Sequence, residues 1–247
     1  MEDKLLKKLE KGDYITLEVT PQKSHTMDTI FKKLESSGMI DNIDGFTVTD
    51  NPLAKLKHSA ILASLKLQNR YNLPVIATIT MRDRNKLALQ SDILGINELG
   101  IRLFLAITGD SAKMSDQPLT KGVFEADSTM LLKIIKCFNA GIDYSGRELI
   151  DKPAHITPFA VSNSYSKNPS NLQKKMVKKL INGAKGIITQ PIYSLQNGEK
   201  ILQIFEEAKK EAGVVDAYLI FGIFPVTRLK TAQFLSSHVP GIEVPNE

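Results

Sequence analysis

The sequence predicts an α/β protein with the fold of a (βα)8 TIM barrel in which the eighth strand is not evident. Three observations predict it. Apolar, β-branched runs alternate with helical stripes, and most of the strand-like runs start about thirty residues apart, the length of one βα unit. The chain length of 247 residues also suits one barrel. We therefore expect residues 1–247 to form a single barrel domain.

Each predicted strand is rich in β-branched or other apolar residues and ends at polar or turn-forming residues. The predicted strands span residues 14–19, 45–49, 75–80, 102–108, 155–161, 186–189 and 217–222. A strand followed by a helix, repeated along the chain, is typical of a parallel sheet covered by helices.

Apolar residues recur at helical spacing between the strands. The stripes include Met27, Ile30, Phe31 and Leu34 in an early segment and Leu172, Met176, Val177, Leu180 and Ile181 in a later one. Two irregular stretches, 109–127 and 141–154, are predicted loops, where functional residues tend to concentrate. A last helix is predicted over 227–237.

A closed barrel needs one more strand than the sequence presents after residue 222. The last predicted helix leads into residues 239–245, which contain two prolines and no clear strand pattern. The barrel could be truncated, completed by an unusual element, or left open. We favour truncation.

Composition excludes several classes of function. The net charge is +5, but Lys and Arg are scattered over helical faces without interleaved aromatics, which argues against nucleic-acid binding. The single Cys137 has no internal disulfide partner and is expected to be buried. Residues 1–11 form an amphipathic helix without the apolar core of a signal peptide, and no stretch is long enough to cross a bilayer. We expect a cytoplasmic protein that does not bind membranes.

Glu18 is the most informative residue, because it lies at the end of the first predicted strand, just before Pro21. In a barrel, the carboxyl ends of the strands face the active site, so a carboxylate there is a candidate acid or base. Polar groups recur at later strand ends. They are Thr49, Asp50, Asn51, Thr80, Arg82, Asp83, Arg84, Asn85, Thr108, Gly109, Asp110, Ser162, Asn163, Thr189 and Gln190.

Several of these polar residues also have a purely structural interpretation. Asp50 and Asn51 could cap a helix near Pro52, Asp83 could cap the helix at Lys86, and Asp110 could be a turn residue. Gln190 is harder to explain structurally, because its neighbours are mostly apolar.

Other common site types are not indicated by the sequence. The basic cluster Lys174, Lys175, Lys178 and Lys179 is expected to be a solvated helix face, although Lys178 or Lys179 could reach a phosphate. The four histidines lack metal-ligand spacing, and no glycine-rich nucleotide motif follows a strand. We therefore expect no metal site.

Six strand-end motifs occur in an order that resembles the methylenetetrahydrofolate reductase family. They are LEVTP at 17–21, TVTDNP at 47–52, TITMRDRN at 78–85, LAITGD at 105–110, GIITQP at 186–191 and GIFPV at 222–226. The likeness is greatest to the reductase modules that some bacteria fuse to a homocysteine methyltransferase, and it extends over nearly the whole chain.

The resemblance implies a (βα)8 barrel that binds FAD, which NADH or NADPH reduces before the folate substrate enters. It implies that 5,10-methylenetetrahydrofolate is reduced to 5-methyltetrahydrofolate for methionine synthesis. Glu18 matches the general acid that protonates N10, Asp110 matches the aspartate beside flavin and pterin, and Gln190 matches the amide that holds the pterin.

The resemblance also implies which residues contact FAD. These are Thr49, Thr108, Gly109, Asp110, Asn168, Lys178 and Lys179. The alternative function is a pterin- or corrinoid-associated barrel protein that binds a one-carbon carrier without redox chemistry. A homo-oligomer is compatible with both functions.

Overall fold

The structure is a computed structural model that describes residues 1–239 and 241–245, apart from the side chain of His238. The chain forms two compact units, Met1–Pro158 and Phe159–Glu247. We describe each unit by itself.

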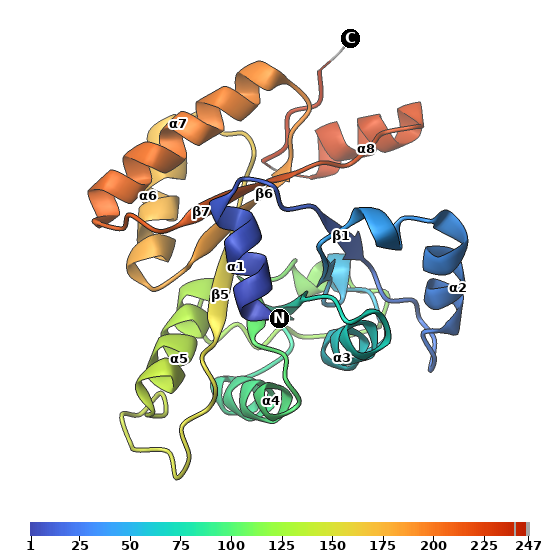
Figure 1. Cartoon of the computed structure of the whole chain (residues 1–247). Helices are drawn as coiled ribbons and strands as arrows, with labels where there is room; N and C mark the ends of the chain where they lie inside the picture. Colours follow the sequence, from blue (N-terminus) through green and yellow to red (C-terminus); the bar gives the residue numbers. More distant parts are fainter. Residues whose placement is uncertain (240, 246–247) are drawn as a thin grey trace. The chain divides into compact units, whose positions relative to one another are not determined.

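The first unit alternates helices with parallel strands. Its elements are α1 (Glu2–Glu10), β1 (Thr16–Val19), α2 (Asp28–Ser37), η1 (Ile40–Asn42), β2 (Gly45–Val48), η2 (Pro52–Ala54), α3 (Ala60–Tyr71), β3 (Val75–Thr80), α4 (Lys86–Glu98), β4 (Leu103–Ile107), η3 (Ala112–Met114) and α5 (Ser128–Ala140). Strand β1 pairs with β2, β2 with β3 and β3 with β4, all in parallel. Helix α3 packs on β2 and β3, and α5 packs on β4 (Figure 1).

The second unit continues the same alternation from β5 (Thr157–Ser162), which begins at the end of the first unit. Its other elements are α6 (Pro169–Ile181), β6 (Gly186–Pro191), α7 (Leu195–Ala212), β7 (Tyr218–Gly222) and α8 (Leu229–His238). Strands β5 and β6 pair in parallel, as do β6 and β7, with a register shift between Ile188 and Pro191. Helices α6 and α7 lie side by side (Figure 1).

Seven parallel strands alternating with helices confirm the predicted α/β fold of the TIM-barrel type, with one strand fewer than eight in the part of the chain described. The strand boundaries lie within two residues of the predicted ones. After α8, residues 241–245 form no strand, and Pro240 lies outside the described residues. The Gly241 carbonyl instead accepts hydrogen bonds from the backbone N–H groups of Ser164 and Tyr165, at 3.0 and 2.9 Å.

The predicted helical stripes form much of the core. Met27, Phe31 and Leu34 are buried, as are Leu172, Met176, Val177 and Leu180. Ile30 is only half-buried, and Ile181 is 56% exposed at the last residue of α6, so the stripe ends one residue earlier than predicted. The prediction that Cys137 is buried was wrong, because it is only partly covered.

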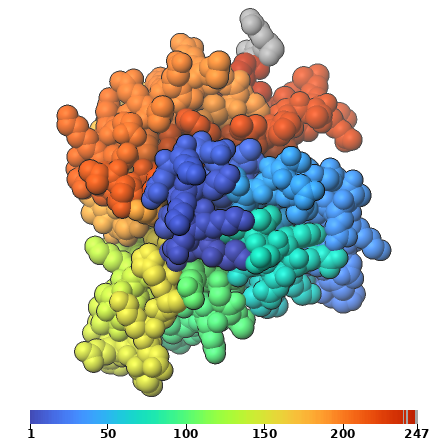
Figure 2. Space-filling view, in the orientation of Figure 1, coloured from blue at the N-terminus to red at the C-terminus, as the bar shows by residue number. Residues whose placement is uncertain are grey.

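Helix α1 is held to the first unit by apolar and polar contacts, and it lies on the visible surface in Figure 2 (dark blue). Leu5 and Leu9 are buried. At its start, a Glu2 carboxylate oxygen contacts His155 Nδ1 at 2.8 Å and accepts from the Thr157 hydroxyl. Among the described helices, none combines the length and apolar character that a membrane span needs.

Candidate functional site

Glu18 is the third residue of β1, paired in register with Thr47 of β2. Its side chain is exposed to solvent, but neighbouring protein atoms replace much of the water around the carboxyl group. This desolvation raises the pKa of Glu18 above the usual value for a glutamate. The carboxyl is thus accessible to a ligand and holds its proton to higher pH than a fully hydrated glutamate does.

The predicted FAD contacts Thr49, Thr108 and Gly109 lie just after β2 and β4. The Thr49 hydroxyl donates to the Thr20 hydroxyl at 3.1 Å, which links the loops after β1 and β2. The Thr108 hydroxyl accepts from the Ser128 N–H at 3.2 Å, at the start of α5. Gly109 has a φ of +91°, and a Cβ there would lie 3.1 Å from the Cβ atoms of Thr80 and Arg82. Position 109 therefore requires glycine.

Asp110 ties the loop after β4 to the loop after β2. Its Oδ2 accepts a hydrogen bond from the Leu53 N–H at 2.6 Å. The side chain is otherwise exposed. Asp110 therefore has a structural contact, and it presents a carboxylate at the predicted site.

The loop after β2 has an unusual backbone conformation. Asn51, Leu53 and Ala54 have φ values of 43°, 56° and 56°. The left-handed region costs a residue with a Cβ about 1–2 kcal/mol, with Asn penalised least. Such a conformation persists only where surrounding contacts hold it.

Arg82 provides one of these contacts from the end of β3. Its guanidinium is buried and donates from Nη2 to the Asn51 carbonyl at 3.0 Å. Nε and Nη2 also donate to the two carboxylate oxygens of Asp83, at 2.7 and 2.6 Å. The hydrogen bonds with Asp83 raise the pKa of Arg82.

A second buried ion pair lies beside the first. The buried Asp50 Oδ2 accepts from the Thr80 N–H at 3.0 Å and from Arg84 Nη1 at 2.6 Å. The capping roles considered for Asp50 and Asp83 were wrong. Asn51 precedes the η2 turn without a side-chain cap, and Asn85 caps α4 by accepting from the Ala88 N–H at 2.8 Å.

In the second unit, Gln190 lies half-buried near the end of β6. The neighbouring strand approaches very closely at this point. The Gly222 N–H donates to the Thr189 hydroxyl at 2.9 Å, and a Cβ on Gly222 would lie 2.4 Å from the Thr189 carbonyl oxygen. The position of Gln190 is thus fixed by backbone packing between β6 and β7.

The predicted FAD contacts in this unit have structural roles or are exposed. The Asn168 side chain caps α6 by accepting from the Ser170 N–H at 3.1 Å. Lys179 Nζ donates to the Val161 carbonyl of β5. Lys178 is exposed, as are Lys174 and Lys175, which agrees with a solvated helix face.

Two cavities of the second unit were not predicted from the sequence. An open apolar groove of about 740 Å³ lies between the ends of β6 and β7 and the start of α7. Its lining includes Tyr193, Leu195, Phe221, Ile223, Phe224 and Pro225. The GIFPV motif contains part of this lining, so exposed apolar residues after a predicted strand were the available signal.

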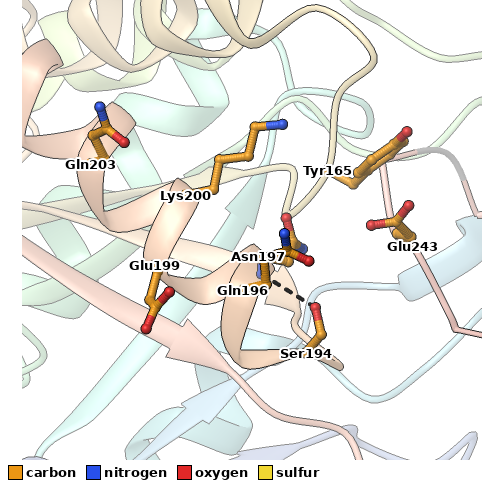
Figure 3. Close-up of a pocket in the computed structure, with 8 residues that line it drawn as sticks. All are labelled: Tyr165, Ser194, Gln196, Asn197, Glu199, Lys200, Gln203 and Glu243. Atoms are coloured by element: carbon orange, nitrogen blue, oxygen red, sulfur yellow. Dashed lines mark hydrogen bonds between the residues drawn. The ribbon is translucent and has the colours of Figure 1, made fainter.

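The second cavity is a polar pocket of about 550 Å³ beside α7 (Figure 3). Lys200 extends from α7 toward the side on which Tyr165 and Glu243 lie (Figure 3). Ser194 accepts from the Asn197 N–H at 3.2 Å and caps α7 at the pocket wall. No sequence pattern indicated this pocket, because its residues come from three separate segments.

Among the described residues, no group of three or more His, Cys, Asp or Glu side chains is arranged to hold a metal ion.

Comparison with known proteins identifies relatives of this chain. Residues 4–247 match the family model described as methylenetetrahydrofolate reductase. No curated protein sequence matches the chain. A solved structure of an uncharacterized protein from Clostridium thermocellum, which binds two copies of 5-methyl-5,6,7,8-tetrahydrofolic acid, is similar with a TM-score of 0.60 and 16% identity over 97% of this chain and 75% of that one.

A further solved structure shares only the fold. It is a 2,3-dimethylmalate lyase of the PEP mutase/isocitrate lyase superfamily, with a TM-score of 0.54 and 13% identity over 99% of this chain and 89% of that one. The family match covers almost the entire chain and agrees with the order of the strands and the strand-end motifs. This chain belongs to the methylenetetrahydrofolate reductase family.

Proposed function

We propose that this protein reduces 5,10-methylenetetrahydrofolate to 5-methyltetrahydrofolate, with FAD as cofactor and NADH or NADPH as reductant, and so supplies methionine synthesis. The observation that carries the proposal is the Glu18 carboxyl, which is accessible at the end of β1 and has a raised pKa. Membership of the family supports the substrate class.

The proposed reaction needs a proton donor, because the five-membered ring of the substrate opens when N10 is protonated. A carboxyl group with a raised pKa keeps a larger protonated fraction near neutral pH than an ordinary glutamate. Glu18 is proposed to give this proton to N10 and to recover it from solvent, to which its side chain is open.

The residues of the first unit fit the polar edge of a flavin ring. FAD, when bound, supplies the hydride that converts the exocyclic carbon to a methyl group. Gly109 has no side chain to obstruct a close approach, and the Asp110 oxygen that does not accept from Leu53 remains an acceptor for a ring N–H. Thr49 adds a hydroxyl, and Thr108 adds a second one that already accepts from Ser128.

For the second unit we propose that the Gln190 amide binds the donors and acceptors of a pterin. The apolar groove next to it offers Tyr193, Phe221 and Phe224, aromatic surfaces suited to a flat ring. Lys178 is proposed to contact a cofactor phosphate, since it is exposed on α6. Lys179 is a second candidate for the phosphate, although its Nζ contacts the Val161 carbonyl. Asn168 is a weaker candidate, because its side chain caps α6.

Absorbance and product analysis test the proposal. The purified protein, reconstituted with FAD, should show a flavin band near ~450 nm that bleaches with NADH or NADPH and returns when methylenetetrahydrofolate is added. The product should be 5-methyltetrahydrofolate by mass. A protein that takes up no flavin, or whose reduced flavin is not reoxidised by the folate, contradicts the proposal.

A second candidate function is binding of a one-carbon carrier without redox chemistry. It is favoured by the similar structure that binds 5-methyl-5,6,7,8-tetrahydrofolic acid and whose function is uncharacterized. Calorimetric titration with 5-methyltetrahydrofolate separates the two candidates. Tight binding by a protein that neither retains FAD nor consumes NAD(P)H supports the carrier-binding function.

A further inference from the structure

Arg82 belongs to a strand-end motif, yet the proposed reaction gives it no role. Arg82 is 1% exposed, which is unusual for an arginine, because removing its charge from water is costly unless it is paired and hydrogen-bonded. The pairing with Asp83 does not explain the burial. The Asp83 side chain is 30% exposed, so an Arg82–Asp83 pair could form nearer the surface at lower cost.

The contact that requires burial is the one with Asn51. Arg82 Nη2 reaches the Asn51 carbonyl at 3.0 Å, at the first residue of the left-handed stretch. Nη1 is buried with no hydrogen-bond partner among the described residues. The guanidinium is therefore held where it reaches Asn51, although this position leaves one of its own donors unsatisfied.

The strained segment 51–54 contacts Asp110 directly. Asn51 precedes Pro52 and Leu53, and the Leu53 N–H donates to Asp110 Oδ2 at 2.6 Å. The direction of that N–H depends on the left-handed backbone at Asn51 and Leu53, and Leu53 lacks the tolerance of glycine for such φ values. Displacing the Asn51 carbonyl would therefore turn the Leu53 N–H and release one oxygen of the Asp110 carboxylate.

We propose that Arg82 is a positioning residue that acts through Asn51 and Leu53 to orient the Asp110 carboxylate. The expected effect of Arg82 on the rate of folate reduction rests on the proposed function, whereas its expected effect on the orientation of Asp110 does not. A lysine in place of Arg82 would not serve equally, since an ammonium cannot hold both Asp83 oxygens and the Asn51 carbonyl in one plane.

Arg84 offers a matched control. It is a largely buried arginine two residues away, paired with Asp50 at 2.6 Å and Asp92 at 2.9 Å. These hydrogen bonds do not involve the 51–54 stretch. Arg84→Lys therefore disturbs a similar ion pair without removing a hydrogen bond of the 51–54 segment.

The first test follows the Leu53 amide by NMR in the full chain with no ligand added. A short bond to a carboxylate shifts an amide proton downfield, so Asp110→Asn should move the Leu53 signal upfield. Arg82→Lys should move it in the same direction, and Arg84→Lys should leave it in place. An unchanged Leu53 signal in Arg82→Lys, or an equal shift in Arg84→Lys, overturns the proposal. If Arg82→Lys does not fold, Asp83→Asn removes the charged partner of Arg82 and also alters the contact of Asp83 with the Asn51 side chain. It is expected to give a smaller shift of the same sign, and no shift overturns the proposal.

The second test is a double-mutant cycle on the single-turnover rate of folate reduction. Arg82→Lys should slow this step about tenfold in the wild-type background and less than about twofold in the Asp110→Asn background, because the effect passes through Asp110. Equal slowing in both backgrounds overturns the proposal. A wild-type protein that does not reduce the folate refutes the proposed function alone, and the NMR result then decides the role of Arg82.

Discussion

At the scale of single residues, Glu18 combines solvent access with a raised pKa. Its side chain is open to solvent, and its pKa is nevertheless raised by desolvation. Substitution of Glu18 is therefore expected to affect the chemistry more than the folding.

We expect Glu18→Gln to retain flavin reduction by NAD(P)H and to slow folate reduction by about 10²–10⁴-fold, because only the second step needs a proton at N10. Stopped-flow measurement of the two half-reactions checks this. Glu10→Gln, at an exposed position of α1, is the control and should leave both rates unchanged. Equal slowing of both half-reactions by Glu18→Gln would assign Glu18 a structural role.

We expect Asp110→Asn to slow folate reduction and change the flavin potential, because the variant removes a negative charge from the proposed ring edge. The asparagine oxygen can still accept from the Leu53 N–H, so the free energy of unfolding should fall by only about 0.5–1.5 kcal/mol. Urea unfolding and single-turnover rates measure the two effects. A larger stability loss with a normal rate would remove Asp110 from the site.

Sequence reasoning identified polar residues at strand ends but not all of their contacts. The alternation of strands and helices was enough to place Glu18, Asp110 and Gln190 at the ends of parallel strands. The pairing of Asp50 with Arg84 requires two loops to meet, which is a property of the folded chain. The positions of Asp50 and Asp83 just before predicted helices suggested that they cap these helices. Local sequence spacing contains no information on long-range contacts such as this ion pair.

At the scale of elements, the pairing of β6 with β7 at Gly222 brings two backbones very close together beside the predicted site residue Gln190. A Cβ at Gly222 would lie 2.4 Å from the Thr189 carbonyl oxygen, which belongs to the backbone and cannot rotate away. The strand positions were predictable from β-branched runs. This close approach was not, because glycine is also common in ordinary turns.

We expect Gly222→Ala to lower the free energy of unfolding by about 1–3 kcal/mol through overpacking. Gly198→Ala in α7 is the matched control, since its Cβ would meet no atom closer than 3.9 Å. Alanine should stabilise that helix by up to about 1 kcal/mol. Urea denaturation of both variants tests the expected difference in stability. Similar midpoints for the two would mean that β6 and β7 can move apart at Gly222 without a loss of unfolding free energy.

At the scale of the whole molecule, the repeat length of the sequence predicted the number and order of the strands, but it did not predict the cavities. Periodicity reports which residues face the core within each element. The apolar groove and the polar pocket depend on how the ends of several segments meet. Ile181 and Cys137 are more exposed than predicted. The apolar pattern of a helix does not show where its last turn loses contact with neighbouring elements.

The raised pKa of Glu18 also predicts how global stability depends on pH. Its pKa is higher in the folded than in the unfolded chain, so the folded state binds more protons between the two values, and stability falls as pH rises through that window. In Glu18→Gln, stability should not show this contribution to its fall with rising pH. Thermal melts from about pH 4 to about pH 8 test it, with parallel curves for the two proteins as the contrary result.

The loop after β2 is tied to three other loops. His58 N–H donates to the Gln22 carbonyl, Leu56 N–H to Asp116, and Leu53 N–H to Asp110, while Arg82 holds Asn51. A loop fastened in this way is ordered before any ligand arrives, so binding there costs little conformational entropy. It is also poorly suited to act as a moving lid. Variants of this loop should therefore change ligand affinity mainly through the dissociation rate, with association nearly constant.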